Sequence, residues 1–190
     1  RLLEQAGWTR GSDGVFEKDG KDLVIPVAFS SESELRRLTA RLMVAQAREA
    51  GIRIVPVPMG SDRLYGSVLN QGDFTAAMAA FGGGGDPSLT GLLASDQIPT
   101  EENAFMGQNV YRWSDPEADS LMRRSDEQVD DAQRAATLAR IQGIVARDVP
   151  LIPLYAQPNT VAYVEALRGV KVNPTQAEVF WNSAEWSLAR

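Results

Sequence analysis

The sequence predicts an α/β fold, in which helices cover the faces of a sheet. Between Leu23 and Phe81, segments of strand and helix character alternate in the order strand, helix, strand, helix, strand. The first strand, Leu23–Phe29, is apolar at consecutive positions, which is typical of a strand covered on both faces. Of the 190 residues, 44% are hydrophobic, enough to form a sizeable core.

The N-terminal residues read as the end of a helix followed by a hairpin. Leu2, Leu3 and Ala6 are apolar, and Gly7 stands where a glycine ends a helix. A natural chain rarely begins in the last turn of a helix, so we expect a piece of a longer protein. Asp19-Gly20 then predicts a tight turn between two strands.

The central alternation predicts where the core lies. A helix capped by Ser31 or Ser33 ends at Gly51, and the strand after it contains Pro56 and Pro58, which favour either an edge position or a strand end. A short helix opened by Ser61 or Asp62 ends at Gly72, and Phe74–Phe81 follows as a buried strand. We expect the packing to centre on five apolar side chains: Leu35, Leu38, Leu42, Val55 and Phe74.

The second half of the chain predicts two helices and two strands. Pro116 begins one helix after Ser114 or Asp115, and a second helix follows Asp130. The apolar segments 151–154 and 159–164 are predicted strands. The buried stripe of the second helix is expected to consist of Leu138, Ile141, Val145 and Val149.

The composition excludes several classes of function. Histidine and cysteine are both absent, so neither Ser-His-Asp catalysis nor a thiolate metal site can be built from this chain. The net charge of −6 argues against nucleic acid and anionic lipid as partners. We expect no enzyme activity, no cofactor and no metal. We also expect no membrane insertion of this segment, because no apolar stretch approaches the ~20 residues of a membrane span.

Six stretches in order resemble the family 5 extracellular solute-binding proteins of peptide- and nickel-type ABC importers. They are LLEQAGW (Leu2–Trp8), DGVFEKDGKDL (Asp13–Leu23), AREAGIRIVPVPM (Ala47–Met59), QGDFTAAMAAFGGGGDP (Gln71–Pro87), QNVYRWSDPEADSLM (Gln108–Met122) and IQGIVARDVPLIPLYAQPNTVAY (Ile141–Tyr163). Each stretch alone is weakly specific, but together they cover essentially the whole chain.

The resemblance implies a type II periplasmic-binding-protein fold, with two lobes closing on a solute. Residues 1–168 would form the C-terminal lobe, incomplete at its N-terminal side, and residues 169–190 would return toward the hinge and first lobe. It also implies a location in the periplasm or elsewhere outside the cytoplasm. The expected partners are a peptide-like or other small solute and the permease subunits of a transporter.

The candidate ligand-binding residues are Phe81, Gly82, Gly83, Gly84, Asn109 and Trp113. The glycine run could instead cradle phosphate or form only a flexible connection, the aromatic residues could belong to the core, and Asn109 could cap a turn. In peptide-binding relatives an aspartate stands three positions after the aromatic residue and pairs with the peptide ammonium. Gly84 occupies that position here, so we expect the solute to lack an essential ammonium at that point.

Two other functions remain open at this stage. A lobe of this fold could capture a solute for sensing or as an adaptor, without transport. With 25 Asp and Glu residues, a carboxylate-dependent hydrolase is also compatible with the composition. The sequence does not name the solute.

Overall fold

The computed structural model describes residues 1–81, 88–156, 160–173 and 179–189. It forms two compact units, one of Arg1–Ala79 with Gly91–Asp115, the other of Ala80–Thr90 with Pro116–Arg190. The expected domains, 1–168 and 169–190, were derived from the family resemblance, whereas the two units are defined by contacts within the chain. The expected domains therefore stay a prediction.

The first unit begins with a short helix and a small antiparallel sheet. Helix α1 (Leu2–Gln5) is followed by Gly7 at φ +83°, as predicted for its stop. Strands β1 (Thr9–Arg10), β2 (Phe16–Lys18) and β3 (Lys21–Asp22) pair in that order. Asp19 and Gly20 both have positive φ, 53° and 71°, which matches a two-residue hairpin turn and confirms that prediction.

A three-stranded parallel sheet follows, in the order β5-β4-β6. Its strands are β4 (Val24–Ser30), β5 (Arg53–Met59) and β6 (Ala76–Met78). The predicted alternation and the edge position of the proline-containing strand are both confirmed. Strand β6 is shorter than the predicted Phe74–Phe81, because only three of those residues pair with β4.

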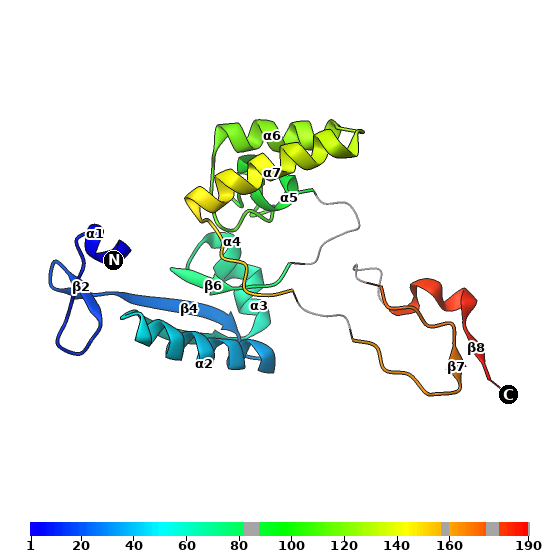
Figure 1. Ribbon diagram of the computed structural model, residues 1–190, viewed down its shortest axis with the longest axis horizontal. Coiled ribbons are helices and arrows are strands. Elements are labelled where there is room, and N and C mark those ends of the chain that lie inside the picture. The colour runs from blue at the N-terminus through cyan, green and yellow to red at the C-terminus, as the bar shows by residue number, and fades with distance from the viewer. Residues whose placement is uncertain (82–87, 157–159, 174–178, 190) are drawn as a thin grey trace. The chain divides into compact units, whose positions relative to one another are not determined.

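Helices cover both faces of this sheet, and Figure 1 shows α2 (Glu34–Glu49) alongside β4. On the α2 face, Val27 and Phe29 pack with Ala40 and Met78. The other face is covered by the continuous helical segment α3 (Ser61–Arg63), η1 (Leu64–Val68) and α4 (Leu69–Gln71). The cluster there consists of Ala28, Leu64, Val68, Leu69 and Val110.

The predicted centre of the packing was wrong for α2. Leu35, Leu38 and Leu42 are 42%, 46% and 63% exposed, and Val55 on the edge strand is 39% exposed. The helix turns Ala40 and Met43 to the sheet instead, while Phe74 packs against the opposite cluster as a partly buried residue. Two apolar stripes on α2 satisfy the helical period, and periodicity alone does not tell which one meets the sheet.

The second unit contains two helices that lie side by side in Figure 1, α6 (Pro116–Glu127) and α7 (Asp131–Asp148). The Asp130 side chain caps α7 by accepting a hydrogen bond from the Gln133 amide at 2.8 Å, as predicted. Met122 and Ile141 are fully buried. The predicted stripe was wrong at Val149, which is 54% exposed, because the helix ends at Asp148 and Val149 adopts a left-handed conformation.

The predicted strand at 151–154 was also wrong, as was the part of the strand predicted at 159–164 that the structure describes, 160–164; residue 159 lies outside the described residues. Residues 151–156 and 160–164 are described without strand pairing. Ile152 and Val164 are 72% and 67% exposed. An apolar run becomes a strand only when a neighbour supplies hydrogen bonds, and among the described residues neither segment has such a neighbour.

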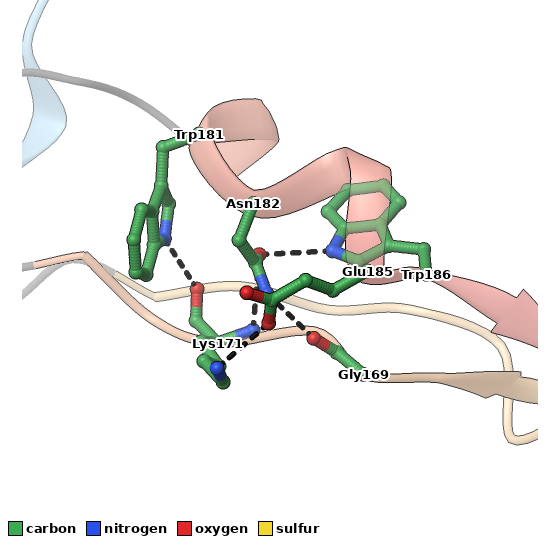
Figure 2. Close-up of polar contacts among 6 residues, drawn as sticks. All are labelled: Gly169, Lys171, Trp181, Asn182, Glu185 and Trp186. Atoms are coloured by element: carbon green, nitrogen blue, oxygen red, sulfur yellow. Dashed lines mark hydrogen bonds and ion pairs between the residues drawn. The ribbon is translucent and has the colours of Figure 1, made fainter.

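The C-terminal segment forms a small hairpin held by polar contacts. Strands β7 (Leu167–Arg168) and β8 (Ser187–Leu188) are antiparallel, with the helical turn η3 (Val179–Glu185) before β8. Figure 2 shows Asn182 at the centre of this network. Its amide donates to the Gly169 carbonyl at 2.7 Å, and its Oδ1 accepts from the Trp186 indole at 2.9 Å.

Candidate ligand-binding site

The carboxyl ends of the three parallel strands meet at one edge of the sheet. From central β4 the chain crosses to β5 on one side and then returns to β6 on the other side. A change of winding direction of this kind leaves a crevice outside the strand ends, where open α/β sheets bind ligands. This edge is therefore the candidate binding site of the first unit.

A polar cluster lies at the end of β4. The Ser30 hydroxyl is buried and lies 2.6 Å from the Ser61 hydroxyl at the start of α3. Its oxygen also accepts a hydrogen bond from the Glu32 amide at 3.3 Å. The Ser61 amide donates to Glu32 Oε1 at 3.2 Å, so a carboxylate is held between two loops of the edge.

Hydrogen bonds from the Ser61 hydroxyl and backbone amide lower the pKa of Glu32 below its usual range. The sequence analysis missed this residue, since the run from Ser30 to Ser33 was interpreted only as a source of helix caps. Ser33 is indeed the N-cap of α2, accepting from the Arg36 amide at 3.3 Å. A polar run just after a buried strand was the signal that could have identified the cluster.

A second set of contacts fixes the same edge. The Ser31 amide and hydroxyl both donate to the Met59 carbonyl at the end of β5, at 2.8 and 3.1 Å. Arg37 donates from Nη1 to the Ser31 carbonyl at 3.0 Å and pairs with Glu34. Both strand ends and the first turn of α2 are therefore joined by hydrogen bonds.

The predicted site residue Asn109 is fully buried and holds a loop together. Its Nδ2 contacts the carbonyls of Leu93, Ala94 and Trp113 at 3.0, 3.0 and 2.8 Å. Its Oδ1 accepts from the Trp113 amide at 3.4 Å. The amide group is thus occupied by backbone, and Asn109 positions the segment that carries Trp113.

That segment is also anchored to the end of α4. Arg112 donates to the Asn70 carbonyl at 2.9 Å. Gly72 allows this arrangement, because a Cβ built there would lie 2.3 Å from Arg112 Nε. Trp113 and Tyr111 are half-buried, and burial raises the pKa of the Tyr111 phenol.

The structure brings together only two of the predicted site residues, Asn109 and Trp113. Phe81, which is 40% exposed, belongs to the second unit and lies three residues beyond the end of β6. Gly82, Gly83 and Gly84 lie outside the described residues. Within the described ranges, no group of His, Cys, Asp or Glu side chains is arranged to hold a metal ion.

Comparisons with known proteins bear on the fold and its relatives, although no protein-family model matches the chain. The oligopeptide-binding protein AppA of Bacillus subtilis is 26% identical over 193 residues, covering 100% of this chain and 34% of AppA. An uncharacterized lipoprotein of Mycobacterium tuberculosis is 24% identical over 171 residues, covering 90% of this chain and 30% of the lipoprotein.

Solved structures give the same result. The structure of AppA in complex with a nonapeptide matches with a TM-score of 0.75 and 23% identity, covering 100% of this chain and 36% of AppA. NikZ from Campylobacter jejuni in complex with Ni(L-His) matches with a TM-score of 0.73 and 20% identity. That match covers 98% of this chain and 37% of NikZ.

Several of the relatives and structural neighbours are thus oligopeptide-binding proteins or substrate-binding proteins of ABC transporters, as the resemblance predicted. The chain has the mixed helix-and-strand fold of part of a periplasmic binding protein. It spans about a third of the length of the curated relatives it matches. Every helix in the described ranges is too short or too polar to span a bilayer.

Proposed function

We propose that this chain is the C-terminal ligand-binding lobe of a substrate-binding component of a bacterial ABC importer. The protein would act outside the cytoplasm, capture a peptide-like or other small solute between two lobes, and deliver it to the permease. The observation that carries this proposal is the match along the entire chain to AppA, an oligopeptide-binding protein. The chemistry would be binding alone, without catalysis, cofactor or metal.

The solute would lie against the carboxyl edge of the parallel sheet. In this proposal Phe81 stacks on the solute, Gly82, Gly83 and Gly84 offer backbone groups, and Trp113 lies nearby. Asn109 would contribute by holding the loop of Trp113, since its own amide group binds three carbonyls. A Phe81→Ala variant of the full-length protein is expected to bind the solute more weakly.

The experiment that tests the function is a thermal-shift screen of the full-length protein. The library would contain peptides, modified peptides, oligosaccharides, opines and metal chelates. A bound solute stabilises the folded state by an amount that grows with its concentration relative to Kd, so at least one class should raise Tm. Failure of every class to raise Tm would contradict solute capture.

The isolated 190-residue chain serves as the control. A site between two lobes buries its ligand from both sides, so one lobe alone lacks much of the contact area. We expect the solutes that stabilise the full-length protein to bind this chain far more weakly. A sensing or adaptor lobe would pass the same screen, and uptake of the solute by cells with and without the gene separates transport from sensing.

A further inference from the structure

One carboxylate anchors the stretch of chain that follows the glycine run. Asp126 Oδ1 accepts a hydrogen bond from the Ser88 hydroxyl at 2.9 Å, and Asp126 Oδ2 accepts one from the Thr90 hydroxyl. Thr90 is the first residue of helix α5 (Thr90–Leu93), and Asp126 belongs to α6, 36 residues further along the chain. The two oxygens of one side chain therefore hold two residues of the same short stretch.

The place of Asp126 within α6 does not by itself favour a carboxylate. Asp126 lies in the last turn of the helix, where the backbone carbonyls carry a partial negative charge and a further negative charge is unfavourable. Its side chain is exposed, so it takes no part in the buried face of α6. The contacts to Ser88 and Thr90 give the carboxylate a use that the helix alone does not.

The anchored stretch leads back to the proposed site. Ser88 lies seven residues after Phe81, which we placed against the solute, and both residues belong to the unit that contains Asp126. A segment with one end held in place samples fewer conformations than a free segment, so less entropy is lost when a ligand orders it. An anchor at Ser88 and Thr90 therefore favours binding without contact between the anchor and the ligand.

We propose that Asp126 is a positioning residue of the solute-binding site. By holding Ser88 and Thr90 it pre-organises the chain that leads from Phe81, and it does so without touching the solute. This inference rests on the proposed function and on a peptide-like solute as the ligand. It assigns to the binding of that solute a residue of α6 that the sequence analysis left out.

Asp126→Asn in the full-length protein tests the inference, because it keeps the size of the side chain but replaces two charged acceptors by one neutral acceptor. The probe is the pentapeptide Ala-Ala-Phe-Ala-Ala, with Kd measured by calorimetry and hydrogen exchange measured without peptide. We expect Kd to rise about fivefold, because more of the ordering cost then falls on the binding step. Exchange at 88–93 should become faster, while exchange in the parallel sheet should not change.

Ser88→Ala combined with Thr90→Val removes the same contacts from the other side. This double variant should also raise Kd about fivefold, and adding Asp126→Asn to it should raise Kd no further, because residues that act through one shared contact are not additive. If the two effects multiply instead, Asp126 acts on binding by another route and the inference is overturned.

Glu127→Gln is the matched control. It removes an exposed carboxylate from the same last turn of α6, and Glu127 has no hydrogen bond or ion pair within the described ranges. Both Kd and the exchange at 88–93 should stay as in the parent, and the Tm without peptide should be the same for Glu127→Gln and Asp126→Asn.

An Asp126→Asn variant that binds the pentapeptide as tightly as the parent overturns the inference. So does one whose Tm without peptide falls well below that of Glu127→Gln, because the contact then serves folding rather than binding. A parent that binds other solutes of the library but not the pentapeptide also overturns it and leaves the proposed function intact, whereas binding of no solute overturns both.

Discussion

Two buried asparagines, Asn109 in the first unit and Asn182 in the C-terminal hairpin, hold loops by the same chemistry in different surroundings. Both are nearly inaccessible, at 0% and 4% exposure, and both donate from Nδ2 to backbone carbonyls. Asn109 is followed by buried Val110 and contacts the carbonyl of buried Leu93. Asn182 lies beside Phe180 and Trp181, which remain 65% and 49% exposed.

The difference shows how apolar burial determines what a polar contact contributes. A hydrogen bond within a desolvated environment is strong, and leaving its partners unpaired there is costly. Where the neighbouring side chains are exposed, the loop can open and water can replace the lost partner. We therefore expect the first unit to depend on its asparagine more strongly than the C-terminal hairpin depends on its own.

The largest expected effect is that of Asn109→Ala. The substitution leaves the carbonyls of Leu93, Ala94 and Trp113 without their shared donor and opens a small cavity. We expect a loss of about 3 kcal/mol in the free energy of unfolding. Urea unfolding would measure it, and hydrogen exchange should rise across 93–113. A loss no larger than that of Asn182→Ala would break the comparison.

Gly169→Ala tests the hairpin through its backbone. Gly169 has φ +84°, and a Cβ added there would lie 2.4 Å from the Glu185 carbonyl oxygen. We expect about 2 kcal/mol of local destabilisation, measured as faster hydrogen exchange at 165–189 with no change in the parallel sheet. Gly143→Ala is the matched control, because its Cβ would meet no atom within 4 Å and alanine favours the helix.

Asn182→Ala should cost less than either of these changes. The Trp186 indole loses its acceptor and the Gly169 carbonyl its donor, but both can turn to water in this exposed hairpin. We expect about 1 kcal/mol, seen as a change in tryptophan fluorescence at lower urea than global unfolding. Coincident loss of fluorescence and of the sheet would show that the hairpin is not an independent unit of stability.

The sequence was sufficient to predict the features that depend only on residues close together along the chain. The turn at Asp19-Gly20, the stop at Gly72 and the cap at Asp130 follow from the conformations and hydrogen bonds of individual residues. The edge position of Pro56 and Pro58 follows from their missing amide hydrogens. The alternation of strands and helices then fixed the parallel sheet.

The sequence was insufficient to predict the features that depend on a partner far away along the chain. The exposed stripe of Leu35, Leu38 and Leu42 and the unpaired segment 151–156 both have the correct apolar pattern. Which stripe of a helix is buried depends on the element that packs against the helix. Whether an apolar segment becomes a strand depends on whether another strand lies beside it. The contacts of Asn109 span up to 16 residues, so its role in holding the loop was not visible in its local sequence.

The same limit applies to the candidate site. The strand ends were predicted to face the ligand, which drew attention to Phe81 and the glycines after β6. The cluster at Glu32 lies at the end of a different strand and requires Ser61, 29 residues away, to hold the carboxylate. A site assembled from several strand ends is only partly visible from any one of them.

The smallest expected effect is a pH response of the C-terminal hairpin. Hydrogen bonds from Lys171 and Asn182 and the charge of Lys171 lower the pKa of Glu185. Lys171 Nζ lies 2.7 Å from Glu185 Oε2 (Figure 2). A carboxyl whose folded pKa is depressed contributes stability above its unfolded pKa, about 4.3, and that stability is lost as pH falls through the folded value.

Hydrogen exchange at 165–189, corrected for the intrinsic pH dependence of exchange, should therefore show less protection below about pH 4 than at pH 6. The change should be small, since both partners are exposed. Other carboxyl groups titrate in the same range, so Glu185→Gln is the decisive comparison: it should be less protected than the parent at pH 6 and should converge with it at low pH. If parent and variant lose protection equally over the whole range, the Lys171–Glu185 contact does not stabilise the hairpin.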